Sequence, residues 1–128
     1  MSKHPQFTMS FAIYGSNENR KEAFNLYYEA FGAKNNGEGY AGDCLHIMME
    51  IYGVEILIGP GDKKALGYES GFNCEIRYSD EAAFRRAYDA LSREGTDCKI
   101  EGPYPWAKQL GLLTDKFGIP WALYYNEE

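Results

Sequence analysis

The sequence has few cysteines, no long apolar run and no concentration of positive charge. The three cysteines, Cys44, Cys74 and Cys98, are widely spaced and odd in number, so they form neither a disulfide framework nor a CxxC zinc site, and we expect thiols that pack as small apolar groups. No apolar stretch approaches the ~20 residues that a membrane-spanning helix needs, and residues 1–11 lack the apolar core of a secretory signal. We therefore expect a cytoplasmic protein with no membrane partner.

The charge balance also excludes several classes of function. Lysine and arginine number 13 against 19 acidic residues, which gives a net charge of -6. Without a basic cluster, the chain has no surface suited to nucleic acid. The short glycine segments at 37–39 and 59–62 lack the Lys-Ser/Thr of a phosphate-binding loop, and no GxGxG turn follows the first predicted strand, which argues against a methyltransferase. The 128 residues, 45% of them hydrophobic, predict a single domain over 1–128.

An aromatic pattern occurs twice, 60 positions apart. The first copy is Phe24, Tyr28, Glu29, Ala30 and Phe31, and the second is Phe84, Tyr88, Asp89, Ala90 and Leu91. Spacings of four and seven place the large apolar residues of each copy on one face of a helix. Cap residues predict that the first helix runs from Ser16 or Asn17 to Gly32, and the second from Ser79 or Asp80 to Gly95.

Segments with strand patterning surround each predicted helix. They are 7–14, 44–52 and 54–59 in the first half, and 72–78, 110–115 and 119–125 in the second. A further strand in each half is left open. The polar, glycine-rich stretch 60–71 is the expected linker. The order predicts an α+β fold of two βαβββ modules, about 7–59 and 72–125, that form a curved mixed sheet with the helices on its convex face. The pattern alone leaves open a ferredoxin-like pair or two halves of a cupped barrel.

At this level of detail the chain resembles a known family. The segments that carry the resemblance are FNLYYEAFGA (24–33), LHIMMEIYG (45–53) and PWAKQLGLLTDKFGIPWAL (105–123), with Leu45-His46 on a strand and an ending formed by Trp106, Gly111, Asp115, Phe117, Gly118 and Trp121. Over residues 7–125 it is similar to the vicinal-oxygen-chelate superfamily of glyoxalase I, extradiol dioxygenases and fosfomycin- and bleomycin-resistance proteins, and within it to the PhnB-like branch. The resemblance implies a small-molecule ligand on the concave face and a cleft often formed across a homodimer.

The alternation of residues along the strands predicts which side chains line that face. If the apolar sets face the helices, the concave face receives Thr8, Ser10, Ala12, His46, Met48, Glu50, Glu55, Leu57, Asn73, Glu75, Arg77, Ala122 and Tyr124. We predict that Ser10, Met48, Glu50, Asn73, Trp106 and Tyr124 contact the ligand, with Trp106 on a loop stiffened by prolines. Trp121 has the opposite parity and is expected in the core. The acidic residues on this face suit a cationic or neutral ligand.

The resemblance implies four places for a divalent metal, and this chain fills them poorly. They correspond to Thr8, Leu57, Asn73 (Phe72 after a one-residue register slip) and Ala122, and none of these is a good ligand. We expect no metal at the usual site. A displaced site built from His46, Glu50, Glu55 and Glu75 stays open as an alternative.

Two classes of function are compatible with these residues. The first is a binding protein that holds a small organic molecule without the usual metal. The second is an enzyme, a lyase, isomerase or dioxygenase of glyoxalase type, that uses His46 with Glu75 or Glu50 as an acid/base couple or at a displaced metal. The poor ligands at Leu57 and Ala122 favour the first class.

Overall fold

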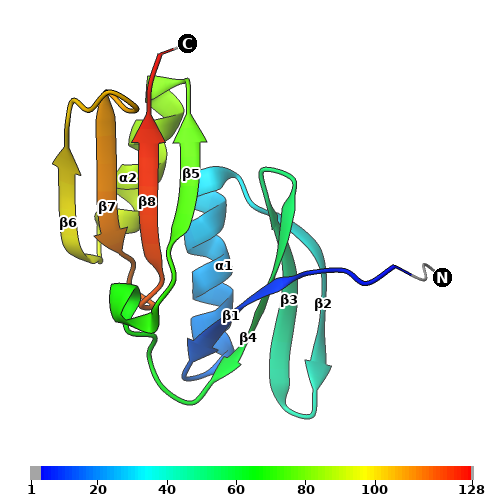
Figure 1. Ribbon diagram of the computed structural model, residues 1–128. Coiled ribbons are helices and arrows are strands. Elements are labelled where there is room, and N and C mark those ends of the chain that lie inside the picture. The colour runs from blue at the N-terminus through cyan, green and yellow to red at the C-terminus, as the bar shows by residue number, and fades with distance from the viewer. Residues whose placement is uncertain (1–3, 128) are drawn as a thin grey trace.

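The computed structural model describes residues 4–127 and contains two modules of the same topology (Figure 1). The first comprises β1 (Met9–Tyr14), α1 (Asn17–Phe31), β2 (Lys34–Ala41), β3 (Cys44–Ile51) and β4 (Val54–Gly61). The second comprises β5 (Cys74–Tyr78), α2 (Glu81–Ser92), β6 (Thr96–Glu101), β7 (Gln109–Thr114) and β8 (Pro120–Tyr125). The predicted α+β fold of two βαβββ modules is confirmed. Within residues 4–127, neither helix has the length and apolarity needed to cross a membrane.

The modules keep separate sheets. The strand order is β1-β4-β3-β2 in the first sheet and β5-β8-β7-β6 in the second, and each first strand runs parallel to its neighbour. The expected curved sheet is therefore split in two within one chain. The strands β2 and β6, which the sequence did not locate, each lie at one edge of their sheet, opposite β1 and β5, and every residue of β2 is exposed. A strand exposed on both faces has no alternation of apolar residues to reveal it.

The helices begin where the caps predicted. The Ser16 hydroxyl accepts from the Asn19 N–H at 3.3 Å, and Asp80 accepts from the Ala82 N–H at 3.0 Å. Gly32 ends α1 in the left-handed conformation, with φ 69°. The second helix ends at Ser92, earlier than the predicted Gly95.

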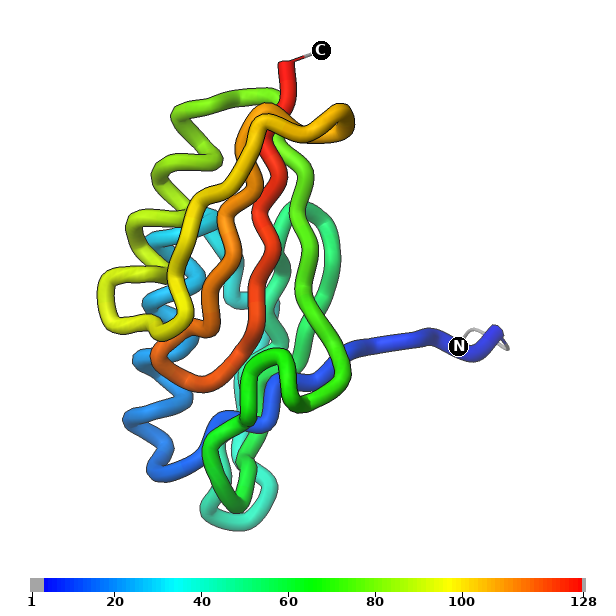
Figure 2. Tube along the Cα trace, turned by 60° about the vertical axis from the view of Figure 1, so that its left-hand side comes forward, coloured from blue at the N-terminus to red at the C-terminus, as the bar shows by residue number. Residues whose placement is uncertain are grey.

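The first strand also starts later than predicted. Figure 2 shows residues 4–8 running away from the body of the chain, and β1 begins at Met9. Phe7, expected to face the helices, is 92% exposed, and Met9 is 38% exposed. The reason is that β1 pairs with β4 only from Met9 onwards, opposite Ile56.

One core joins the modules. The two helices pack against each other and against their own sheets. At the centre, the Trp121 ring of β8 lies 5.9 Å from Phe11 of β1, 5.7 Å from Tyr27 and 4.9 Å from Phe31 of α1, measured between ring centroids. Trp121 is thus a core residue, as predicted from its parity.

A buried carboxylate fixes the turn beside this core. Asp115 is 1% exposed. Its Oδ1 accepts from the N–H groups of Phe117 (2.8 Å) and Ile119 (3.1 Å), and its Oδ2 accepts from the Tyr27 hydroxyl (2.7 Å) and Trp121 Nε1 (3.0 Å). The segment from Asp115 to Trp121 therefore connects the two modules and forms the turn between β7 and β8.

The linker is docked on that same turn. It contains a short 3-10 turn, Gly67–Ser70, and the Gly67 N–H donates to the Gly118 carbonyl at 2.9 Å. A Cβ on Gly118, whose φ is 89°, would lie 2.2 Å from the Ala65 carbonyl oxygen. Only glycine permits this close approach.

Candidate functional site

Each sheet has one face on the helices and one open face. Along β3 the residues alternate between buried and half-buried, with His46, Met48 and Glu50 on the open side. On β5, Glu75 and Arg77 are exposed between half-buried and buried neighbours. The predicted parity of these strands is confirmed, and the side chains proposed for the concave face point away from the core.

On the first sheet, His46 lies over a neighbouring strand. Its Nδ1 is 3.0 Å from the Cys44 carbonyl oxygen. A carbonyl can only accept, so Nδ1 is the donor in this contact, and in the neutral ring Nε2 then presents a lone pair. The ring lies against Gly59 of β4, where a Cβ would be 3.6 Å from Nε2 and 3.9 Å from the Ser10 hydroxyl oxygen. His46 and Ser10 are therefore near each other across the first sheet.

The two glutamates of this sheet form a separate group. Glu50 of β3 is paired with Glu55 of β4. The Asn36 side chain donates to both, at 3.1 Å and 3.2 Å, and the Lys34 ammonium lies 3.8 Å from Glu50. These polar partners balance two carboxylates held side by side.

The second sheet carries a connected polar cluster. Glu75 Oε2 accepts from Asn73 Nδ2 and from the Tyr124 hydroxyl, both at 3.2 Å, while Glu75 Oε1 lies 3.6 Å from an Arg77 nitrogen. The Arg77 guanidinium carbon is 5.0 Å from the centroid of the Tyr124 ring. Burial raises the pKa of the Tyr124 hydroxyl, and the nearby Glu75 charge raises it further.

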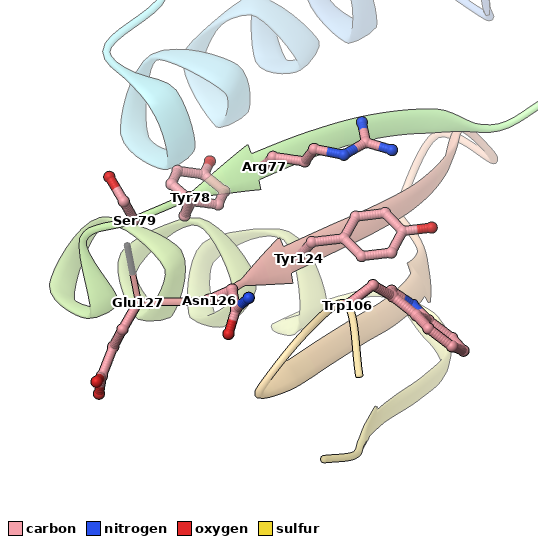
Figure 3. A pocket seen from close by; sticks show the side chains of 7 residues that line it. All are labelled: Arg77, Tyr78, Ser79, Trp106, Tyr124, Asn126 and Glu127. Carbon is pink, nitrogen blue, oxygen red and sulfur yellow. The ribbon is translucent and has the colours of Figure 1, made fainter. Parts of the chain in front are cut away.

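A hollow of about 490 Å³ lies beside this cluster, at the C-terminal ends of β5 and β8. Its lining is Arg77, Tyr78, Ser79, Trp106, Tyr124, Asn126 and Glu127. In the close view, the Arg77, Tyr124 and Trp106 side chains extend in the same direction from three different segments (Figure 3).

Trp106 is held rigidly although it is 61% exposed. Its ring is stacked on Tyr104, with centroids 4.9 Å apart and an interplanar angle of 3°. Tyr104 and Ala107 exchange two backbone hydrogen bonds, and the Tyr104 hydroxyl donates to Glu101 at 2.6 Å. The β6–β7 loop therefore presents a fixed aromatic surface.

The predicted residues form two groups in one chain. Ser10, His46, Met48 and Glu50 belong to the first sheet, and Asn73, Glu75 and Tyr124 to the second, with Trp106 beside them. The couple of His46 and Glu75 is therefore divided between two sheets that share no strand pairing. Its catalytic role stays a prediction, as do the ligand contacts.

The side chains at the four positions that the resemblance implies for a metal are poor ligands. Thr8 precedes β1 and is exposed, Leu57 is apolar, and Asn73 offers an amide. Ala122 has no donor atom and is 1% exposed, although its parity places it on the open face. Among residues 4–127, no three histidine, cysteine or acidic side chains converge to hold an ion, so His46, Glu50, Glu55 and Glu75 do not form a displaced site within one chain.

The thiols are separate from this chemistry. All three cysteines are free, as expected, with Cys44 and Cys74 half-buried and Cys98 exposed. Burial raises the pKa of Cys74 to about 12, which keeps it protonated and inert as a nucleophile at neutral pH.

Sequence reasoning missed two tyrosines near the site. Tyr104 stacks on Trp106, and the only sequence signal for this contact is that the two aromatic residues lie two positions apart in the segment PYPW. Tyr68 lies in the linker turn, which carries no periodic pattern. Burial raises the pKa of Tyr68, and Tyr124 and Glu75 add to the rise, which places the Tyr68 hydroxyl close to the second-sheet cluster.

Comparison with known proteins bears on the fold. No protein-family model and no curated protein matches the sequence. Among solved structures, a putative 3-demethylubiquinone-9 3-methyltransferase, PhnB protein, from Bacillus cereus is 18% identical, with TM-score 0.69 over 95% of this chain and all of that one. A glyoxylase/bleomycin resistance protein/dioxygenase domain from Frankia sp. EAN1pec is 11% identical, with TM-score 0.67 over 99% of both chains.

A third structure is TnmS3, an antibiotic binding protein from Streptomyces sp. CB03234, at 15% identity and TM-score 0.58 over 98% of this chain and all of that one. At such identities the likeness concerns the fold and not the activity. The resemblance predicted from the sequence is thus confirmed at the level of architecture: the chain has the fold of PhnB-like and glyoxalase/bleomycin-resistance/dioxygenase structures.

Proposed function

We propose that this protein binds a small organic molecule between the open faces of its sheets, without a metal at the usual position of the fold. The observation that carries the proposal is the linked group of Asn73, Glu75 and Tyr124 beside the hollow of about 490 Å³. These side chains are hydrogen-bonded into fixed positions on an outward face, where they contribute nothing to the core. A few convergent polar groups next to an aromatic surface are typical of small-molecule sites.

Two further points support binding rather than metal chemistry. Leu57 and Ala122 cannot ligate an ion, so no step of the proposed function passes through one. One structure with this fold, TnmS3, is described as an antibiotic binding protein. A cytoplasmic location remains part of this proposal.

The cleft is completed by a second copy of the chain. β1 and β5 each lie at the edge of their sheet, and an unpaired edge favours association. Between the modules lies a crevice of about 380 Å³, lined mainly by apolar side chains such as Met9, Val54 and Ile76 and also by Asn73, Glu75 and Arg77. Val54 is 59% exposed. A two-fold partner would cover this crevice and bring the open face of one first sheet opposite the second sheet of its partner.

The dimer is tested by light scattering on purified protein. We expect a homodimer for the wild type and a monomer for Val54→Glu, which puts a charge into the crevice. Tyr40→Glu is the matched control, because Tyr40 is similarly exposed, at 61%, but lies on β2 at the other edge of the first sheet. A wild type that is monomeric at tens of micromolar, or a Val54→Glu variant that stays dimeric, would refute this interface.

The binding function is tested by metal analysis and by NMR of the tag-free protein. We expect no stoichiometric zinc, nickel, manganese or iron, and no stabilisation when these ions are added. A chemically mixed set of organic compounds should contain binders that shift the Trp106 indole signal, an effect reduced in Tyr124→Ala but not in Tyr14→Ala. Stoichiometric metal that is lost in His46→Ala would overturn the metal-free proposal.

One observation favours the enzyme as the second candidate. His46 Nδ1 is held by the Cys44 carbonyl at 3.0 Å, so Nε2 can accept a proton from a bound substrate. In the proposed dimer, Glu75 of the second chain is the carboxylate that approaches it. Conversion of a bound compound, followed by NMR, should then cease in His46→Gln while binding persists. If no compound is converted, or if His46→Gln converts it at the wild-type rate, the enzyme candidate is wrong.

A further inference from the structure

The linker turn carries a tyrosine onto the open face of the second sheet. Gly67 is buried, with φ 61°, and a Cβ there would lie 2.6 Å from the Thr114 hydroxyl oxygen. Together with the 2.9 Å hydrogen bond from the Gly67 N–H to Gly118, this contact fixes the turn against β7 and β8. The next residue, Tyr68, is therefore held in place and does not belong to a free loop.

Tyr68 and Tyr124 lie near one carboxylate. Although Tyr68 is 47% exposed, partial burial is the main cause that raises its pKa, followed by the proximity of Tyr124 and Glu75, while the Lys99 charge and a hydrogen bond with Asn73 lower it. Lys99 itself is paired with Glu101 at 2.8 Å. The Tyr124 hydroxyl donates to Glu75 at 3.2 Å, and Tyr68 is a neighbour of this pair on the linker side. We call Tyr68, Asn73, Glu75 and Tyr124 the tyrosine–glutamate cluster.

The cluster has an acceptor without a donor. Asn73 Nδ2 donates to Glu75 at 3.2 Å, but Asn73 Oδ1 is buried and has no hydrogen-bond partner among the described residues. A buried carbonyl oxygen without a donor is unfavourable. An N–H group that entered the cluster would satisfy it and at the same time meet the Glu75 carboxylate.

Arg77 already holds a cation beside Glu75 and Tyr124. Its guanidinium lies over the Tyr124 ring, with 5.0 Å between the guanidinium carbon and the ring centroid, and 3.6 Å from a Glu75 oxygen. The side chain is 74% exposed and its ion pair is long, so it is held weakly. A phenol face beside a carboxylate is a recognised environment for organic cations.

We propose that the tyrosine–glutamate cluster binds the ammonium or guanidinium group of an organic cation, which displaces the Arg77 guanidinium. Glu75 is the counter-ion, Asn73 Oδ1 accepts an N–H, and the ring of Tyr124 lies against the cation. This inference rests on the proposed binding function and names its ligand class.

Three probes of equal size and different charge test the proposal by NMR titration of the full-length protein. They are 4-phenylbutylamine, 4-phenylbutanol and 4-phenylbutyrate. We expect the amine to bind about tenfold more tightly than the alcohol, the equivalent of one charge contact worth about 1.4 kcal/mol, and the carboxylate to bind most weakly. Glu75→Gln should remove the preference for the amine and leave the alcohol unchanged. Asp89→Asn, which removes one negative charge on the surface of α2, is the control and should alter neither.

Arg77→Gln gives the sharpest outcome, because it removes a competitor. It should strengthen amine binding about threefold, whereas an anion site would lose affinity in this variant. Tyr124→Leu should weaken amine binding, whereas Tyr14→Leu, on the first sheet, should not. Tighter binding of the carboxylate, weakened by Arg77→Gln, would overturn the proposal. If alcohol and carboxylate bind the cleft but the amine does not, only the cation inference fails. If no compound of any charge binds, the proposed function fails as well.

Discussion

Replacement of Asp115 by asparagine tests the view that this carboxylate joins the two modules. The introduced amide would keep one oxygen for the Phe117 and Ile119 N–H groups, but its nitrogen would face two donors in place of Oδ2, the Tyr27 hydroxyl and Trp121 Nε1. The hydroxyl can rotate and accept, whereas the indole N–H cannot. A hydrogen bond to a charged group contributes about 1.5–3 kcal/mol. Relief from burying a charge offsets part of the loss.

We therefore expect Asp115→Asn to lower the free energy of unfolding by about 2–3 kcal/mol at pH 7, or the melting temperature by about 6–12 °C. Urea unfolding at one fixed protein concentration measures it. Tyr27→Phe removes a donor to the same oxygen, so the double variant should show a coupling on the order of 1 kcal/mol. Strict additivity, or a loss below about 0.5 kcal/mol, would refute the reasoning.

The pH dependence provides a second test of the same residue. Burial raises the pKa of Asp115, although its four donors oppose the rise. The native state therefore binds a proton more readily than the unfolded chain. The part of the stability that this pKa shift supplies is complete below the unfolded pKa of about 3.9 and is lost as pH rises through the higher native pKa, and the hydrogen bonds to the carboxylate supply the part that remains at pH 7. The difference between wild type and Asp115→Asn should thus shrink as pH increases in that window.

Two other predictions concern the linker and the thiols. Gly118→Ala, whose Cβ would lie 2.2 Å from the Ala65 oxygen, should cost about 2–3 kcal/mol and make residues 62–70 sensitive to limited proteolysis; resistance equal to that of wild type would contradict the docked turn. With N-ethylmaleimide at pH 8, Cys74 (pKa about 12) should react far more slowly than exposed Cys98 in the native protein. In urea the two thiols should react equally fast, which mass spectrometry of the peptides would record. Rapid labelling of Cys74 in the native protein would contradict its burial.

Local patterns explain why the helices and most strands could be predicted. The aromatic repeat and the caps at Ser16, Gly32 and Asp80 each depend on residues only a few positions away in the sequence. The outer strands β2 and β6 were missed because an exposed edge imposes no apolar alternation. Phe7 was misplaced because the apolar alternation of β1 already starts at Phe7, whereas the pairing with β4 begins only at Met9.

The candidate site was predictable only in part. Alternation along β3, β5 and β8 was enough to assign Glu75 and Tyr124 to an open face. It could not indicate that His46 and Glu75 lie on separate sheets, because the pairing between strands depends on contacts remote in sequence. Nor could it find Tyr68, which reaches the cluster only because Gly67 and Gly118 dock the linker.

By itself, the sequence determined the two-module arrangement and which residues of β3 and β5 face the helices, since periodicity and capping are properties of neighbouring residues. The tertiary structure decided the rest. It packed α1 against α2, kept the four strands of each module in a sheet of their own with β1 and β5 at the edges, and docked the linker turn on Gly118. Those choices follow from how side chains far apart in the chain fill one core, which no local pattern specifies.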